Sequence, residues 1–236
     1  MSNKVNRFVV FDTETTGISI EDAHKIIEIG CVEVVDGKIT SHHFHSYLNP
    51  EREIDKEALA VHNISVDFLK DKPKFSQIAE DLRSFFYKDE NLYKTYLVAH
   101  NANFDVRFIN HEFLLIGLHE NLYDNFEIID TVILSRKIYP GQPANLNALC
   151  ERLGIDKSER DANGHGALLD AKLLAHAFVL LTADRDILSL IEKQVDFLGF
   201  NKQNELLPAR DFSSLLTEEE CGNHRSFTQK YALKEW

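Results

Sequence analysis

Apolar residues follow the two-residue period of β-strands through most of the first fifty positions. Runs rich in Val, Ile and Phe predict three strands there: Phe8–Phe11, Lys25–Val35 and Lys38–Leu48. Asp36-Gly37 lies between the second and third runs and is a typical two-residue hairpin turn. We therefore expect the chain to begin with a three-stranded meander.

After Pro50 the apolar spacing lengthens to that of helices, and helices alternate with two further short strands. The predicted helices are residues 54–60, 66–70, 75–86, 104–118, 131–139, 145–153 and 166–182. The predicted strands are Tyr96–Ala99 and Glu127–Asp130. A meander followed by alternating strands and helices predicts an α/β fold with a five-stranded mixed sheet flanked by helices. We expect the first strand to lie centrally in that sheet.

Beyond Thr182 no sustained periodicity remains. We predict one domain over residues 1–182 and a poorly structured C-terminal tail over residues 183–236. Apolar pairs such as Leu206-Leu207 and Leu215-Leu216 indicate that this tail becomes ordered on a partner. The alternative interpretation is a partly disordered tail that has no partner.

The chain is acidic, with 26 basic and 38 acidic residues and a formal charge of −12. Affinity for duplex DNA rests largely on Lys and Arg, so this charge argues against a protein that coats DNA. It is compatible with a nuclease that holds one strand end through metal ions, because bound cations reverse the local charge. Three widely separated cysteines and the absence of a long apolar segment predict a cytoplasmic protein that does not contact membranes.

Carboxylates occur where predicted elements end or begin. Asp12 and Glu14 follow the first strand and, being two residues apart, share one face of it. Two carboxylates that close repel each other, and a divalent cation with its preference for oxygen ligands relieves that repulsion. Asp105 stands at the start of the helix after Tyr96–Ala99. Each feature alone also fits an ordinary surface or helix-start residue.

His165 and Asp170 stand five residues apart, which on one helix would separate their directions by about 140°. Gly164 and Gly166 resolve this difficulty, because they allow His165 to lie in a turn before the helix. Asp170 then projects from the second helical turn, inside an apolar run. A buried charge is costly unless it is paired or binds metal, so we consider both residues candidates for a metal site.

These three segments, in this order, resemble the motifs of the DEDDh, or DnaQ-like, exonuclease superfamily. They are Asp12-Thr13-Glu14-Thr15-Thr16-Gly17, His100-Asn101-Ala102-Asn103-Phe104-Asp105 and His165-Gly166-Ala167-Leu168-Leu169-Asp170. Two more stretches, His24–Gly30 and Leu146–Cys150, resemble the epsilon (proofreading) subunits of bacterial DNA polymerase III. The resemblance covers about residues 5–182 and implies a ribonuclease H-like fold.

By this resemblance the chain is a 3′→5′ exonuclease that releases 5′-mononucleotides from a single-stranded 3′ end of DNA. The residues implied as ligands of two Mg²⁺ or Mn²⁺ ions, and as contacts to the substrate through them, are Asp12, Glu14 and Asp170. Asp105 completes the acidic set, and His165 is the implied general base. Glu57 and His62 match positions that contact the terminal nucleotide.

The resemblance also implies partners. The tail would dock on the polymerase (alpha) subunit, and the small theta subunit is a further candidate. Arg185 and Leu190 stand where the family's clamp-binding motif has Gln and an aromatic residue, so the sequence argues against binding of the sliding clamp. Two other functions stay open: an RNA-processing exonuclease similar to RNase T or oligoribonuclease, and a non-catalytic scaffold for a polymerase.

Overall fold

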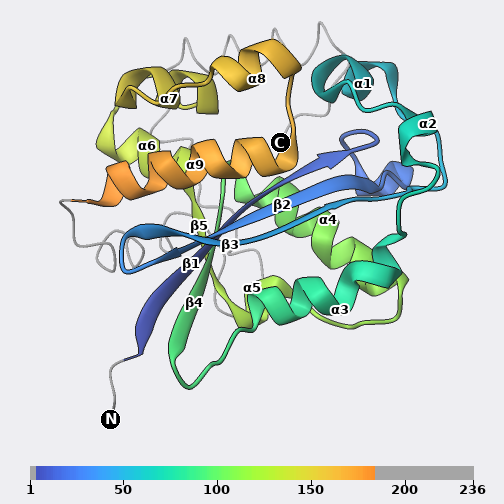
Figure 1. The fold of residues 1–236 in the computed structure, drawn as a ribbon, viewed down its shortest axis with the longest axis horizontal. Helices are drawn as coiled ribbons and strands as arrows, with labels where there is room; N and C mark the ends of the chain where they lie inside the picture. The colour runs from blue at the N-terminus through green and yellow to red at the C-terminus, as the bar shows by residue number, and fades with distance from the viewer. Residues whose placement is uncertain (1–3, 184–236) are drawn as a thin grey trace, which may run out of the picture. The chain divides into compact units, whose positions relative to one another are not determined.

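The computed structural model describes residues 4–183 and contains one five-stranded sheet in the order β3-β2-β1-β4-β5 (Figure 1). The strands are β1 (Val5–Thr15), β2 (Ile26–Val35), β3 (Lys38–Tyr47), β4 (Tyr93–Ala99) and β5 (Glu127–Asp130). β2 is antiparallel to both of its neighbours, whereas β4 runs parallel to β1 and β5. The predicted mixed sheet with a central first strand is therefore confirmed.

Nine α-helices and one 3-10 helix lie within the described residues. They are η1 (Ile20–Asp22), α1 (Lys56–His62), α2 (Val66–Leu69), α3 (Phe75–Phe86), α4 (Ala102–Leu115), α5 (Leu122–Asn125), α6 (Thr131–Ile138), α7 (Leu146–Leu153), α8 (Ser158–Asn163) and α9 (Ala167–Thr182). The short, polar helices α5 and α8 were not predicted, because neither carries an apolar stripe long enough to show a period. The sequence also predicts a turn at Thr15-Thr16-Gly17; β1 stays paired with β2 through Thr15, so the chain bends one residue later, from Thr16.

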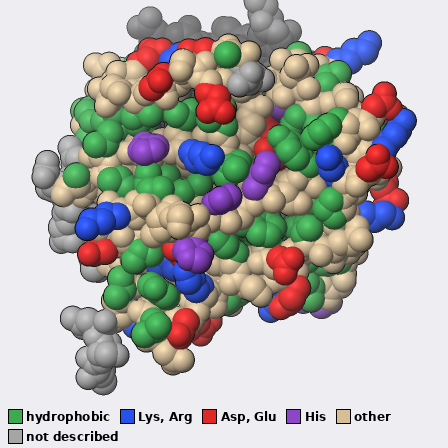
Figure 2. All heavy atoms as spheres, viewed as in Figure 1, with side chains coloured by type: hydrophobic (Ala, Val, Ile, Leu, Met, Phe, Trp, Pro, Cys, Tyr) green, Lys and Arg blue, Asp and Glu red, His purple; other side chains and the backbone are tan. Residues whose placement is uncertain are grey.

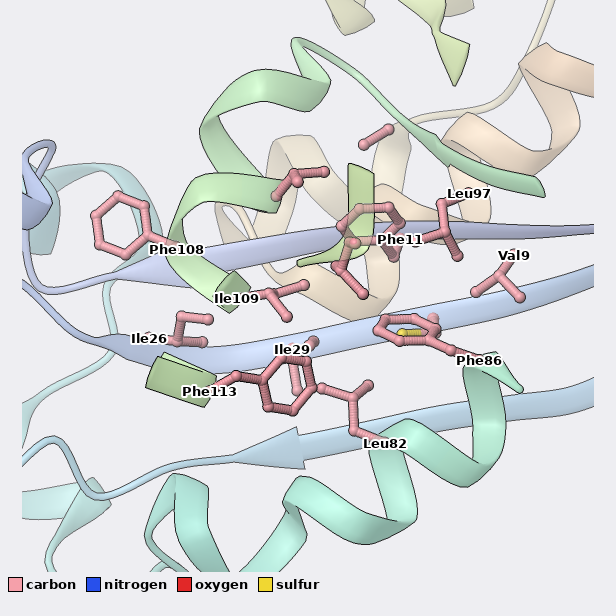
Figure 3. Close-up of a cluster of buried hydrophobic side chains, with 14 of the residues drawn as sticks. Val9, Phe11, Ile26, Ile29, Leu82, Phe86, Leu97, Phe108, Ile109 and Phe113 are labelled. Carbon is pink, nitrogen blue, oxygen red and sulfur yellow. The ribbon is translucent and has the colours of Figure 1, made fainter. Parts of the chain in front are cut away.

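Alternation along β1 sends its side chains into two hydrophobic cores, one on each face of the sheet. Phe8 and Val10 pack with α6, α7 and α9. Val9 and Phe11 pack with α3, α4 and α5 on the opposite face (Figure 3). Full burial of such side chains contributes about 1.5–3 kcal/mol each. Even-numbered residues of β1 therefore face α6, α7 and α9, and odd-numbered residues face α3, α4 and α5.

Two of the three cysteines, Cys31 and Cys150, are buried free thiols, and Cys221 lies outside the described residues. Within residues 4–183, no helix is long and apolar enough to cross a membrane. The predicted tail lies outside the described residues from position 184 onward, and so does the segment Arg185–Leu190.

Candidate active site

The last residues of β1 have a neighbouring strand on one edge only. Pairing with β4 ends at Val10, whereas pairing with β2 continues to Thr15. Asp12 and Glu14 lie in this part of β1, two and four residues after Val10. Because side chains alternate along a strand, both point to the face covered by α9, as Val10 does. The two carboxylates thus lie where the sheet opens between β1 and β4.

Asp105 reaches the same place from the other face of the sheet. Its Oδ1 accepts hydrogen bonds from the backbone N–H of Thr13 at 3.0 Å and from the Thr13 hydroxyl at 2.6 Å. The start of α4 is anchored in turn by Asp130, whose carboxylate accepts from the backbone N–H of Ala102 at 3.1 Å. Asn101 precedes the helix with φ of 67°, a conformation that Asn tolerates well.

Strand β2 holds the N-terminus of α9 and thereby positions Asp170. The Oε2 atom of Glu28 accepts from the backbone N–H of Ala167 at 3.0 Å. Gly30 lies so close to α9 that a Cβ added there would be 2.3 Å from the backbone nitrogen of Leu168. In the strand register Glu28 is opposite Glu14, so the start of α9 lies next to the β1 carboxylates.

His165 lies in the turn between α8 and α9, as predicted. Its Nδ1 is 3.3 Å from Oδ2 of Asp170. One ligand atom from each of Glu14, His165 and Asp170 lies within 4.8 Å of the other two. The structure therefore brings together the three sequence segments that carry the candidate residues.

The carboxyl groups of this cluster repel one another in a buried environment. Burial and then the charges of Asp105 and Glu14 raise the pKa of Asp12 well above its ordinary value. Burial and then the charge of Asp170 raise the pKa of Glu14 to about 8. Burial also raises the pKa of Asp105 to about 7, although hydrogen bonds from Thr13 oppose that rise. Charge of this sign and density favours a bound cation.

The donor set fits a divalent metal. Carboxylate oxygens are the ligands that Mg²⁺ and Mn²⁺ prefer, and Glu14 and Asp170 present them within reach of one ion. Asp12 shares the face of Glu14 and interacts electrostatically with both. Glu14 and Asp170 could therefore hold a metal ion together, and Asp12 lies beside Glu14 on the same face of β1.

A cleft of about 280 Å³ borders the cluster and includes His62, His165 and Glu28 among its lining residues. His62 is 4% exposed, and its Nδ1 accepts a hydrogen bond from the backbone N–H of Ile64. Burial lowers the pKa of His62, and a hydrogen bond with the backbone of Thr15 opposes that change. Glu57, in the first turn of the same helix, is exposed and does not line this cleft. Several histidine side chains are visible on the face of the molecule that carries α9 (Figure 2).

One residue of the site escaped sequence analysis. Arg160 on α8 pairs with Asp170 and contacts His165 and Asn147. Its position in the polar run Ser158–Asn163 is typical of a solvent-exposed helix, yet the side chain is buried. Burial alone would raise the pKa of Asp170, but hydrogen bonds from His165 and Arg160 and the charge of Arg160 lower it.

Similarity to known proteins agrees with this geometry. The profile of a family described as exonuclease (RNase_T) matches residues 9–178. DNA polymerase III subunit epsilon of Rickettsia felis is 39% identical over 225 residues, which cover 94% of this chain and 95% of the relative. The chain belongs to the DNA polymerase III epsilon family of exonucleases. The epsilon subunit of Escherichia coli K12 is 42% identical over 187 residues, covering 77% of this chain and 74% of that one.

Solved structures support the same family fold. Exonuclease X in complex with 5′-overhanging duplex DNA has a TM-score of 0.54 and 27% identity, covering 85% of this chain and 97% of that one. The nuclease domain of 3′hExo, a DEDDh family member bound to rAMP, has a TM-score of 0.63 and 22% identity, covering 78% of this chain and 95% of that one. These likenesses confirm the ribonuclease H-like fold, and the family confirms that the chain is a nuclease.

Proposed function

We propose that this chain is the proofreading 3′→5′ exonuclease subunit of a bacterial replicative DNA polymerase, acting in the cytoplasm. The reaction would be hydrolysis of the 3′-terminal phosphodiester of DNA, with release of a 5′-mononucleotide. The observation that carries the proposal is the convergence of Glu14, His165 and Asp170 on one point, next to Asp12. The relatives named DNA polymerase III subunit epsilon support the choice of DNA as substrate.

Two divalent ions, Mg²⁺ or Mn²⁺, would be held by Asp12, Glu14 and Asp170, with Asp105 completing the acidic set. When bound, such ions make hydroxide available near neutral pH and neutralise charge on the attacking and leaving oxygens. The raised pKa values of Asp12 and Glu14 support this role, because a cation lets these groups ionise together. Through the ions, the same side chains would orient the terminal phosphate.

His165 would act as the general base. Its side chain is 40% exposed, so its ring can reach solvent, while Asp170 lies 3.3 Å from its Nδ1. An imidazole is the side chain best suited to take a proton from water near neutral pH. A neighbouring carboxylate orients the ring and stabilises the imidazolium that forms.

The terminal nucleotide would enter the cleft beside His165. The position of the His62 ring in the lining of this cleft supports a contact there. Glu57, exposed on the same helix, would contact the nucleotide from the solvent side. Both roles follow from the resemblance of residues 57–62 to the family motif.

The proposed macromolecular partners are the polymerase (alpha) subunit, through residues 183–236, and the theta subunit. Support comes from relatives that are named as subunits of DNA polymerase III and that match 94% or more of this chain. Binding to the sliding clamp is not part of the proposal, because Arg185 and Leu190 replace the motif residues.

One experiment tests the function. Mispaired DNA ends, paired DNA ends and short RNA are digested in parallel with Mg²⁺ or Mn²⁺, with and without EDTA. We expect EDTA-sensitive release of mononucleotides, fastest from mispaired DNA, and loss of that release in Asp12→Ala with the fold intact. Faster digestion of RNA would favour an RNA-processing exonuclease instead. Absence of any digestion by the folded wild-type chain would favour a non-catalytic scaffold.

A further inference from the structure

The guanidinium of Arg160 forms a two-pronged pair with the carboxylate of Asp170. Nε donates to Oδ1 at 2.6 Å, and Nη2 donates to Oδ2 at 2.9 Å. Both side chains are buried, with 7% and 5% of their surfaces exposed. A planar guanidinium matches a carboxylate in this way better than an ammonium does. Both oxygens of a proposed metal ligand are thus engaged by a cation that belongs to the chain.

Further contacts hold this guanidinium in place. Nη1 donates to Oδ1 of Asn147 on α7, and Nη2 also lies 2.9 Å from Nδ1 of His165. Asn147 is the polar residue of the Leu146–Cys150 motif, whose Leu146, Leu149 and Cys150 pack into the core. The position of the guanidinium is therefore set by α7, α9 and the turn between α8 and α9.

The charge of Arg160 makes Asp170 unlike the other carboxylates of the site. The buried guanidinium of Arg160 pairs with Asp170, whereas Asp105 accepts its hydrogen bonds from the uncharged Thr13. Within residues 4–183, neither Asp12 nor Glu14 has an ion-pair partner that would replace a metal in this way. One proposed metal ligand therefore carries its own countercation.

We propose that Arg160 is an internal countercation that competes with the divalent metal for Asp170 and weakens metal binding to the free protein. Arg160 is a positioning residue, because it acts on a metal ligand and does not contact the substrate. The inference rests on the metal site of the proposed function. It assigns Asn147 the role of holding the guanidinium against Asp170.

The physical reason is linkage between the two cations. A buried Asp170 beside Glu14 is strongly unfavourable without a cation, so Arg160 stabilises the metal-free fold. Whatever stabilises the metal-free state relative to the metal-bound state lowers the affinity for metal by the same factor. A weak site fills readily only when substrate phosphate adds oxygen ligands. Arg160 would thereby make metal occupancy depend on a seated 3′ end.

The test is calorimetric titration of Mn²⁺ into the full-length chain, with Arg160→Gln compared with wild type. We expect Arg160→Gln to bind Mn²⁺ about tenfold more tightly or better, because removal of one charge of a buried pair leaves Asp170 uncompensated. In EDTA the same variant should unfold at a lower temperature, and saturating Mn²⁺ should narrow that difference. Arg83→Gln is the matched control, since Arg83 pairs with Glu80 and Glu120 on the opposite side of the sheet.

Unchanged or weaker Mn²⁺ binding by folded Arg160→Gln would overturn the proposal, because an arginine that merely builds the site would lower affinity when removed. If Arg160→Gln does not fold, Asn147→Ala decides, since it loosens the guanidinium and keeps its charge. Tighter Mn²⁺ binding by Asn147→Ala supports the competition, and weaker or equal binding overturns it. Failure of the proposed function gives a different pattern: no Mn²⁺ binding by any variant and no nuclease activity of wild type.

Discussion

Oδ1 of Asp105 accepts two hydrogen bonds from Thr13, one from the backbone N–H and one from the hydroxyl. Thr13 lies between Asp12 and Glu14, but its side chain points to the opposite face of β1. The carboxylate of Asp105 therefore joins α4 to the strand that carries the other acidic residues. This oxygen thus stabilises the junction between α4 and β1.

Thr13→Val tests this junction. The loss of a buried hydroxyl–carboxylate bond should lower the free energy of unfolding by about 1.5–3 kcal/mol and should slow hydrolysis by displacing Asp105. Urea unfolding and single-turnover rates measure the two effects. Thr40→Val is the control, because its hydroxyl donates to Glu33 in a separate network and its loss should reduce stability alone. Equal single-turnover rates for Thr13→Val and wild type would show that the positioning of Asp105 by Thr13 does not affect hydrolysis.

The acidic cluster should make the metal-free protein less stable as pH rises. The pKa of Glu14 is about 8 in the fold against an ordinary value of 4.5, so the folded chain binds more protons than the unfolded chain between these values. The free energy of unfolding therefore falls from about pH 4.5 to about pH 8. In EDTA we expect the melting temperature to fall by more than about 3 °C over that range.

Metal and substitution should both reduce this pH dependence. Saturating Mn²⁺ offsets the repulsion, and Glu14→Gln removes the titrating group. Glu90→Gln, on an exposed residue, should leave the slope unchanged. The prediction fails if the melting temperature of wild type in EDTA stays constant or rises as pH increases.

Gly30→Ala should disrupt the site through the backbone of α9. The added Cβ would lie 2.3–2.6 Å from backbone atoms of Ala167 and Leu168, which cannot give way as a flexible side chain can. We expect a loss of about 1–3 kcal/mol in the free energy of unfolding and a larger relative loss of activity, because Asp170 moves with the helix. At Gly166 an added Cβ would lie 3.6 Å from Oε2 of Glu28, an ordinary contact distance, so Gly166→Ala should fold normally. Similar stability of the two variants would contradict this packing argument.

His165→Ala should separate proton transfer from metal binding. Loss of a general base typically slows hydrolysis by about 10²–10⁴-fold, whereas the carboxylate ligands remain. Rates at saturating substrate and calorimetric Mn²⁺ titration give the two measurements. His176→Ala, on an exposed position of α9, controls for the loss of an imidazole. A variant that loses Mn²⁺ binding but keeps its rate would exclude the general-base role.

Deletion of residues 183–236 tests the proposed partner segment. The shortened chain should keep its exonuclease activity, because every proposed catalytic residue lies before position 183. It should no longer co-purify with the polymerase subunit when the two are co-expressed. Retained co-purification would place the binding surface elsewhere in the chain.

Much of the fold could be predicted because its signals are local. The alternation around Phe8–Phe11, the Asp36-Gly37 hairpin and the helical spacing after Pro50 each depend on residues near one another in the chain. The structure confirms the sheet that these signals predict. The predicted turn at Thr15-Thr16-Gly17 begins one residue later, at Thr16, because strand pairing with β2 extends through Thr15.

By itself, the sequence determined which carboxylates and which imidazole are candidates for the site, and that they stand at a strand end, a helix start and a Gly-flanked turn. Only the tertiary structure decided how they are held. Thr13 and Asp105 are 92 residues apart, and Glu28 and Ala167 are 139 apart. The pairing of Arg160 with Asp170 joins α8 to α9, and no local period encodes that contact. Buried polar contacts of this kind arise only when separate elements pack and exclude water.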